Sequence, residues 1–354
     1  MHSQIIDSTD PLWMQTLHRL DHDFYHLPEF LDLESDRLQA ISEAAVIQEN
    51  ENIFFLPYLL RQWDGGSGKE VGWDIVSPYG YPGFLINAID NRAEFIKRAV
   101  VHLQTVWQKR KICSAFLRLH PTLNSGVEQD LADYSALQVS GRTVSVDLAC
   151  SADDLWKQTR ENHRRGIRRL KEIGFSASMV PVETNLDDFI TIYEETMDRV
   201  NAKPLYYFNR NYFLQLVRSL KPHIHLCVAQ LNQTVAAAAL ITECNGIVQY
   251  HLGGTLNSFL REAPMKLIFN YVRFWAKERG NHLLHLGGGL GAAQDSLYNF
   301  KLGFANQTHS FSTLRLILDE AQYLSWVTCK AKQNHQPPDL LLSSNFFPAY
   351  RFSI

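Results

Sequence analysis

The chain has 354 residues, of which 45% are hydrophobic and 20% are charged. At about 100–200 residues per domain, this length predicts two compact domains, with one large domain as the alternative. The composition excludes a disordered or low-complexity chain. The formal net charge of -3 excludes attraction of the whole protein to nucleic acid or to an anionic membrane, so any such attraction must be local.

Cysteine usage and the apolar segments indicate the compartment. The 5 cysteines include no Cys-x-x-Cys pair, which argues against a disulfide framework or a zinc knuckle and favours a reducing compartment. The N-terminus lacks the basic and apolar regions of a signal peptide, and polar residues interrupt the longest apolar stretch, residues 226–241. We therefore expect a soluble, cytoplasmic monomer or small oligomer without a transmembrane segment.

The first half of the chain shows one helical pattern, a hairpin and a second helix. Apolar residues at spacings of three and four predict an amphipathic helix near the start, carrying Trp13, Leu17, Leu20, Phe24 and Tyr25. Two apolar runs separated by a polar turn predict a β-hairpin over residues 43–47 and 52–60. Three further elements follow: a Gly-, Pro- and Tyr-rich loop over 74–83, a helix over 91–110 and a strand over 114–120.

The second half repeats that order. It contains a hairpin over 224–231 and 234–242, a strand over 247–252, a loop over 253–263, a helix from Pro264 to Gly280, and a strand over 282–286. This repeat predicts an α/β fold with mixed sheets and two similar halves, residues 1–147 and 148–354. A Rossmann fold is disfavoured because neither half begins with a Gly-x-Gly-x-x-Gly turn between a strand and a helix.

The most unusual segment is the basic stretch over residues 156–175. On one continuous helix, Lys157, Arg160, Arg164, Arg168 and Lys171 form a stripe flanked by Arg165 and Arg169. The opposite face carries Trp156, Ile167, Leu170 and Ile173. Although a charge run is often only a solvated face, a positive stripe in an acidic protein favours binding of phosphates, whether of a nucleotide-activated substrate, coenzyme A or RNA.

Residues 250–304 hold the second group of candidates. Strands that end at Gly253–Gly254 and Gly288–Gly289 would expose backbone N–H groups, and the helix near Pro264 would point its positive end the same way. Asp295, Tyr298 and Lys301 recur every three residues and would share one face of a short helix. The alternatives are tight turns for the glycines and core packing for Tyr298.

Metal and hydrolase sites have no support in the sequence. The 14 histidines include no His-Glu-x-x-His motif and no Cys/His cluster at ligand spacing, although His223 and His225 share one strand face. No Gly-x-Ser-x-Gly elbow is present, so a hydrolase triad is not indicated. We therefore expect no metal site.

Several of these segments together resemble the FemAB-like, or type 6 acetyltransferase, branch of the GNAT acyltransferase superfamily. In the second half the matching pieces are NHRRGIRRLKEIGF (162–175), YEETMDRVNAKPLYYF (193–208), YHLGGT (250–255), LHLGGG (284–289) and SLYNFKLGF (296–304). In the first half, DIVSPYGYPG (74–83) and FLRLHP (116–121) are similar to the corresponding loop and strand. The resemblance covers about residues 40 to 310 and implies two GNAT-like halves in tandem.

The resemblance also implies transfer of an acyl or aminoacyl group to an amine. Donors in this family are acyl-coenzyme A and aminoacyl-tRNA, so tRNA is a partner only with the second donor, and no tightly bound cofactor is expected. Acceptors are phosphate-bearing or lipid-linked, such as amino sugars, nucleotide sugars and peptidoglycan precursors of the cell envelope. The chain lacks the helical hairpin that embraces tRNA in some relatives and the Arg/Gln-x-x-Gly-x-Gly/Ala loop of ordinary GNAT enzymes, which leaves both donors open.

Acyl transfer to an amine needs a general base, oxyanion donors and an acid. Glycine-loop amides after Leu252 and Leu286 are candidates to polarise the carbonyl. His251 or Asp295 is the candidate base, Tyr298 the candidate acid, and Lys301 the cation that holds a phosphate or stabilises the oxyanion. Strand alternation can instead bury His251 as a satisfied core histidine.

Substrate-binding candidates lie in both halves. They are Arg160, Arg164, Arg165, Arg168, Tyr79, Tyr207, Gly253, Gly254, Gly288 and Gly289. Phe300 and Phe304 can anchor a short helix, which would leave Lys301 off the buried face and facing a cleft. The competing hypothesis is a non-catalytic protein of the same fold that binds RNA or another polyanion through its basic stretch. The aromatic and Gly-rich loops favour a small-molecule cleft instead.

Overall fold

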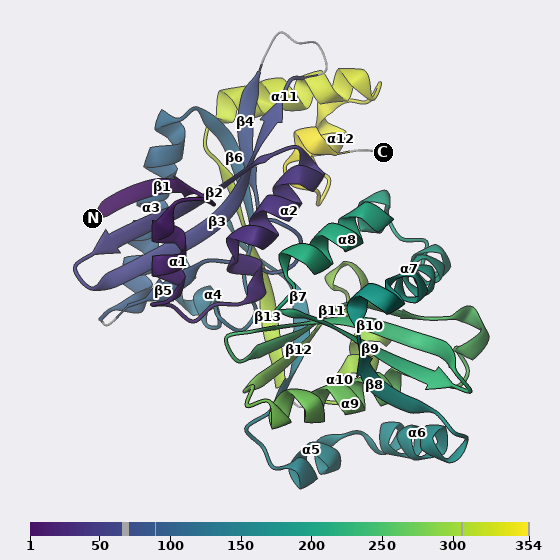
Figure 1. Ribbon diagram of the computed structural model, residues 1–354. Coiled ribbons are helices and arrows are strands. Elements are labelled where there is room, and N and C mark those ends of the chain that lie inside the picture. The colour runs from purple at the N-terminus through teal and green to yellow at the C-terminus, as the bar shows by residue number, and fades with distance from the viewer. Residues whose placement is uncertain (66–70, 89, 306, 353–354) are drawn as a thin grey trace. The chain divides into compact units, whose positions relative to one another are not determined.

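The protein folds into two compact units in the computed structural model (Figure 1). The structure describes residues 1–65, 71–88, 90–305 and 307–352. Unit 1 comprises Met1–Ser140 together with the chain from Ser310 onward, and unit 2 comprises Gly141–His309. The sequence prediction divided the chain at 147/148 and gave everything after that point to the second half. The structure differs because the chain returns to unit 1, where its last strand pairs with an earlier one.

Unit 1 is built on a mixed sheet. Its strands are β1 (His2–Asp7), β2 (Ile41–Glu49), β3 (Asn52–Trp63), β4 (Gly72–Val76), β5 (Leu85–Asn87), β6 (Ile112–Arg118) and β13 (Gln307–Ile317). They are ordered β1-β2-β3-β4-β6-β13, with β5 beside β3. Neighbours are antiparallel except β4 and β6, which are parallel. The predicted hairpin is therefore confirmed as β2 and β3. The first three residues of the predicted loop over 74–83 belong to β4.

The helices of unit 1 each bury apolar side chains, and the longer ones bury a whole apolar face. They are α1 (Pro11–Leu17), α2 (Pro28–Leu38), α3 (Arg92–Lys109), α4 (Val127–Asp130), α11 (Glu320–Gln333) and α12 (Pro338–Leu342). The predicted helix over 91–110 is confirmed as α3, whose Phe95, Ala99 and Leu103 enter the core. The predicted N-terminal helix ends early, because α1 stops at Leu17 and a 3-10 turn (Phe24–His26) precedes α2.

A buried carboxylate ties the C-terminal segment to the sheet of unit 1. Asp74 on β4 has no exposed surface and accepts hydrogen bonds from the guanidinium groups of Arg61 and Arg351 at 2.9 and 2.6 Å. The Tyr350 hydroxyl donates to the same carboxylate at 2.9 Å and lies 2.7 Å from the Ser114 hydroxyl. The negative charge of Asp74 is thus balanced by two cations.

Unit 2 has a sheet of the same type. Its strands are β7 (Leu137–Asp147), which begins in unit 1, β8 (Ser176–Val180), β9 (Ile224–Leu231), β10 (Thr234–Cys244), β11 (Ile247–Thr255) and β12 (Leu283–Gly287). The order is β7-β12-β11-β10-β9-β8. Among the strand pairs of the described residues in this unit, β11 and β12 alone are parallel. The second predicted hairpin is therefore confirmed as β9 and β10.

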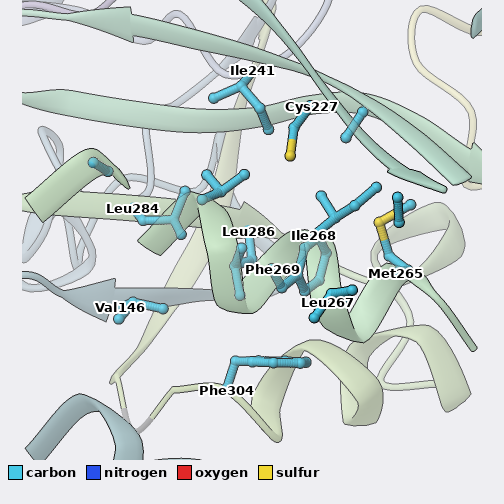
Figure 2. Close-up of a cluster of buried hydrophobic side chains, with 14 of the residues drawn as sticks. Val146, Cys227, Ile241, Met265, Leu267, Ile268, Phe269, Leu284, Leu286 and Phe304 are labelled. Carbon is cyan, nitrogen blue, oxygen red and sulfur yellow. The ribbon is translucent and has the colours of Figure 1, made fainter. Parts of the chain in front are cut away.

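Helices lie on both faces of the sheet of unit 2. They are α5 (Ala152–Gln158), α6 (Glu161–Glu172), α7 (Val182–Arg199), α8 (Arg210–Ser219), α9 (Met265–Glu278) and α10 (Ser296–Leu302). Figure 1 shows α7 and α8 on one face and α9 and α10 on the other. Figure 2 shows the core on the α9 side, where Ile268 and Phe269 of α9 lie with Leu284 and Leu286 of β12 and with Phe304. The helix predicted to begin at Pro264 is confirmed as α9, for which Pro264 is the N-cap.

The predicted repeat of topology is present in the structure. In unit 1, two antiparallel strands and β4 are followed by α3 and by β6, which pairs parallel to β4. In unit 2, β9, β10 and β11 are followed by α9 and by β12, which pairs parallel to β11. Within the residues that the structure describes, no helix combines the length and apolar character needed to cross a membrane.

Candidate functional site

The parallel strands β11 and β12 separate after the first third of β11. They pair over Ile247–Gln249 and Leu283–His285 only, after which β11 continues to Thr255 beside β10. The β10–β11 register also shifts here, because Ile241 pairs with Tyr250 and Leu240 with Leu252, leaving His251 as an extra residue. Bulges of this kind concentrate next to functional sites because they redirect side chains.

Lys301 of α10 lies where the two strands separate. Its Nζ donates a hydrogen bond to the Gly288 carbonyl, directly after β12, at 2.7 Å. The same Nζ lies 5.3 Å from the centroid of the Tyr250 ring, which directly follows the last paired residue of β11. Lys301 therefore contacts both strands at the point where their ladder ends.

The Lys301 amine is buried without a counter-ion. The residue is only 5% exposed, and no carboxylate of the described residues lies within ion-pair distance of its Nζ. Burial lowers the pKa of Lys301 to about 7, although the charge of Asp295 acts in the opposite direction. An amine with this pKa is present in both protonation states near neutral pH, which suits a group that moves a proton. The expectation that Lys301 lies off the buried face of its helix is wrong.

Asp295 caps the helix that carries Lys301. Its carboxylate accepts the backbone N–H groups of Tyr298 at 2.9 Å and Leu290 at 3.0 Å. Burial acts to raise the pKa of Asp295, but these backbone hydrogen bonds outweigh it and hold the pKa below its usual range. Asp295 therefore precedes α10 as its N-cap and does not share a helix face with Tyr298 and Lys301. Tyr298 is buried in the hydrophobic core of unit 2.

The glycine pairs occupy two different settings. Gly253 and Gly254 pair with Ala239 and Ala238 inside β11, so the prediction that they end the strand in a loop is wrong. A Cβ at Gly254 would lie 2.3 Å from the Thr196 hydroxyl of α7, so the residue allows a helix to pack closely on the strand. Gly288 and Gly289 do follow β12 in a loop. A Cβ at Gly289 would lie 2.2 Å from the Asp295 carboxylate, as expected for a tight turn.

His251 lies on β11 next to Tyr250. Its side chain is mostly buried, as the core-histidine alternative requires, and it is the extra residue of the bulge described above. No group of three or more His, Cys, Asp or Glu side chains able to hold a metal ion occurs among the described residues.

The basic stretch forms two helices rather than one. Thr159 and Arg160 both have extended backbone angles and separate α5 from α6, so Lys157 lies on a different helix from the arginines. The break arises because the Arg160 backbone N–H donates to the Gly303 carbonyl at 2.8 Å instead of continuing a helix. Ile173 is 47% exposed, so its predicted place on the apolar face is wrong, whereas Ile167 and Leu170 are buried as expected.

The arginines of α6 have few partners within unit 2. Arg164 donates to the Lys157 carbonyl at 3.3 Å, and Arg165 lies 3.9 Å from the exposed Glu161 carboxylate. The Arg168 guanidinium lies over the Trp156 ring at 5.6 Å. Exposed contacts of this type contribute little to stability, so the arginine face remains available to an anion.

The predicted tyrosines lie in different units. In unit 1, the Tyr79 backbone N–H donates to the buried Glu34 carboxylate at 2.9 Å. In unit 2, Tyr207 is 43% exposed and its hydroxyl donates to Asp198 at 2.9 Å. That hydrogen bond raises the pKa of Tyr207.

Two residues close to Lys301 were not among the sequence candidates. The Tyr250 ring lies under its amine, and Tyr250 was part of the YHLGGT segment without being singled out. His163 of α6 bonds to the carbonyl of Phe300, the residue before Lys301, at 2.9 Å. His163 lies within the basic stretch, and no sequence pattern marks it out from its neighbours. Its burial distinguishes it in the structure, but this burial depends on residues that are distant in the sequence.

One family model matches most of the second unit. Residues 157–301 match the model of the acetyltransferase (GNAT) domain. This match spans α6 to α10 and includes Lys301. No protein of curated function matches the sequence.

Solved structures share the fold over most of the chain. FemX has a TM-score of 0.68 at 12% identity, covering 91% of this chain and 99% of its own. L-PGS from Bacillus licheniformis has a TM-score of 0.52 at 13% identity, with 94% and 98% covered. The C-terminal domain of a putative lysylphosphatidylglycerol synthetase from Agrobacterium fabrum has a TM-score of 0.52 at 12% identity, with 88% and 91% covered. The predicted α/β fold class with two similar halves is thereby confirmed.

Proposed function

We propose, on the premise that residues 157–301 form a GNAT domain and that the chain is an acyltransferase with a FemAB-like fold, that this enzyme acylates an amine of a phosphate-bearing acceptor. The acceptor class is an amino sugar, a nucleotide sugar or a peptidoglycan-type or lipid-linked precursor of the cell envelope. The donor is acyl-coenzyme A or an aminoacyl-tRNA.

The reaction moves one acyl group and one proton. The acceptor nitrogen attacks the acyl carbonyl carbon, and a tetrahedral intermediate with an oxyanion forms. The bond from that carbon to the donor sulfur, or to the ester oxygen of an aminoacyl-tRNA, then breaks. The nitrogen loses a proton and the leaving group gains one, so a single group that accepts and then donates a proton completes the step.

The observation that carries this proposal is the buried Lys301 amine where β11 and β12 separate. With a pKa of about 7, the neutral amine can take the proton from the attacking nitrogen. The resulting ammonium can stabilise the oxyanion and then protonate the leaving group. Asp295 and Gly288 hold Lys301 in place, because the first caps α10 and the second accepts its hydrogen bond.

The arginines of α6 support a phosphate-bearing substrate. Arg164 and Arg168 present positive charge with no carboxylate of the described residues within ion-pair distance of either. Guanidinium groups bind phosphate oxygens through paired, charge-assisted hydrogen bonds. One structural relative is a domain of a protein named as a putative lysylphosphatidylglycerol synthetase, and this name combines a lysyl group with a phospholipid. This name agrees with an aminoacyl donor and a phosphate-bearing acceptor here.

The test is a transfer assay with two donors and matched acceptors. The purified chain is incubated with acetyl-coenzyme A or with a mixed aminoacyl-tRNA pool. The acceptors are a uridine-diphosphate amino sugar and the same amino sugar without phosphate, and products are detected by mass spectrometry. We expect N-acylation of the phosphorylated acceptor by one of the donors, and none by Lys301→Ala above background. Failure with both donors across a panel of phosphorylated amines, or equal activity in Lys301→Ala, would contradict the proposal.

A further inference from the structure

The basic helix α6 is joined to the end of the helix that carries Lys301. The Arg160 backbone N–H donates to the Gly303 carbonyl at 2.8 Å, and its guanidinium donates to the Asn299 carbonyl at 3.3 Å. His163 lies 2.9 Å from the Phe300 carbonyl through Nε2. A carbonyl only accepts, so this nitrogen carries the proton. The last carbonyls of a helix have few intrahelical partners. Here Arg160, the N-cap of α6, and His163 supply further donors to the final turn of α10, where the Gly303 N–H already donates to the Phe300 carbonyl at 3.1 Å.

His163 is built into this junction. It is 4% exposed, and its ring centroid lies 5.1 Å from that of Phe300 and 4.7 Å from that of Phe304. A Cβ at Gly303 would lie 2.3 Å from His163 Nε2, so a side chain at that position would displace the imidazole. Gly303 has an ordinary helical backbone, and its small size therefore serves the approach of His163.

The charge state of His163 agrees with a hydrogen-bond donor inside the protein. Burial lowers the pKa of His163, and the cations of Lys266 and Arg160 lower it further, against the effect of the Phe300 carbonyl. The imidazole is therefore neutral near physiological pH. With its proton on Nε2, it donates a second hydrogen bond to the Phe300 carbonyl, which also accepts the Gly303 backbone N–H at 3.1 Å.

We propose that His163 and Arg160 are positioning residues that hold α10 in place, and with it the Lys301 amine against Gly288 and Tyr250. The Phe300 carbonyl belongs to the peptide unit that leads into Lys301, so a displacement of this peptide is transmitted directly to the lysine. Because Arg160 directly precedes α6 and His163 lies on it, the junction also connects the proposed phosphate-binding surface to the proposed acyl-transfer group. This inference rests on the proposed role of Lys301.

The experiment compares His163→Ala with His163→Gln. The glutamine side-chain amide can donate to the Phe300 carbonyl, and alanine cannot. We expect His163→Ala to lower kcat roughly tenfold, as fits the loss of one positioning hydrogen bond, with little change in the KM of the phosphorylated acceptor. His163→Gln should recover most of the loss. Asn162→Ala, an exposed neighbour on the same helix, is the control and should match the wild type.

A second readout follows Lys301 without requiring turnover. NMR of the lysine side chains, with Lys301→Arg used to assign the resonance, reports the pKa of Lys301 in each variant. Loss of the junction should loosen α10 and admit water, so the pKa of Lys301 should rise in His163→Ala and return toward its wild-type value in His163→Gln. A merely structural His163 would lower the melting temperature in both variants without moving this pKa.

A double-mutant cycle isolates the junction itself. Gly303→Ala should impair kcat in the wild-type background, because the new methyl group displaces His163, and should have little further effect in His163→Ala. Additive losses, or an unchanged kcat and Lys301 pKa in His163→Ala, would overturn the inference. If Lys301→Ala itself keeps full activity, the proposed function fails first, so the two failures are distinguishable.

Discussion

The two halves share a topology but differ where their parallel strands end. In unit 1, β4 and β6 stay paired to Val76 and Phe116, and the Ser77 N–H continues the ladder to the Phe116 carbonyl at 3.0 Å. In unit 2, the pairing of β11 and β12 stops at Gln249 and His285 although β11 runs on to Thr255. At the same position in the repeat, the two parallel strands therefore stay paired in unit 1 and separate in unit 2.

The buried charges differ in the same way. Asp74 in unit 1 is enclosed by two arginines and a tyrosine hydroxyl, so its charge is fully compensated. Lys301 in unit 2 donates to one carbonyl and has no carboxylate partner among the described residues. A paired buried charge is maintained by its partners, whereas an unpaired one shifts its pKa and becomes reactive. The comparison indicates a structural role for Asp74 and makes Lys301 the candidate for chemistry.

The largest expected effect is on turnover. Lys301→Ala should reduce kcat by roughly a hundredfold or more, the loss typical of one group that stabilises the transition state. Its melting temperature should change little, because a desolvated amine contributes little to stability. Lys277→Ala is the matched control, since the Lys277 amine also donates to a backbone carbonyl, that of Leu148 at 2.9 Å. A kcat near the wild-type value in Lys301→Ala would show that Lys301 takes no part in the reaction.

The converse experiment concerns stability. Asp74→Asn removes the negative charge from a buried cluster that holds two arginines, and breaking such a cluster costs about 3 kcal/mol. Urea unfolding should show this loss, while the protein that remains folded keeps its kcat. Equal stability of Asp74→Asn and the wild type would show that the two arginines do not depend on Asp74.

Stability should also depend on pH through Lys301. Its pKa is about 7 in the folded protein and close to the ordinary lysine value when unfolded, so the unfolded state holds more protons between these values. The free energy of unfolding should therefore rise with pH, by roughly 1 kcal/mol from pH 7 to pH 8. The measurement is the difference between the wild type and Lys301→Met, in which the other groups cancel. A constant difference across this range would contradict a lowered pKa.

The smallest effect is expected on substrate affinity. Arg164→Glu combined with Arg168→Glu reverses the charge of the arginine face and should raise the KM of a phosphorylated acceptor about fivefold, because exposed ion pairs are weak. Added salt should reproduce part of the loss in the wild type. Both side chains lie away from the core, so the melting temperature of the double mutant should equal that of the wild type. An unchanged KM at low salt would show that the arginine face of α6 is an ordinary solvated surface.

Local patterns in the sequence predicted much of the fold. The apolar periodicity of residues 91–110 and the proline before Met265 depend on neighbouring residues only, and both helices form as expected. The GNAT resemblance is confirmed by the match over 157–301. The break at Arg160 was not predictable, because its N–H binds the carbonyl of Gly303, more than a hundred residues away. The continuation of β11 through Gly253 and Gly254 likewise depends on a helix that packs closely on it.

The sequence proposed candidate residues but not their environment. The spacing of Asp295, Tyr298 and Lys301 predicted one shared helix face, whereas in the structure the three residues are a helix cap, a core residue and a buried amine. Burial of Lys301 results from the separation of two strands and from a capped loop, which no local pattern encodes. The roles of His251, Tyr298 and the arginines in the reaction stay predictions.

The most direct test of the central claim is the pKa of Lys301 itself. NMR titration of the lysine side chains, with the Lys301 resonance assigned by its loss in Lys301→Arg, should find one lysine titrating near pH 7 while the others titrate near their ordinary value. The pH dependence of kcat should show a limb at the same pH. A Lys301 resonance that titrates near pH 10, or a kcat profile with no limb near 7, would contradict the account.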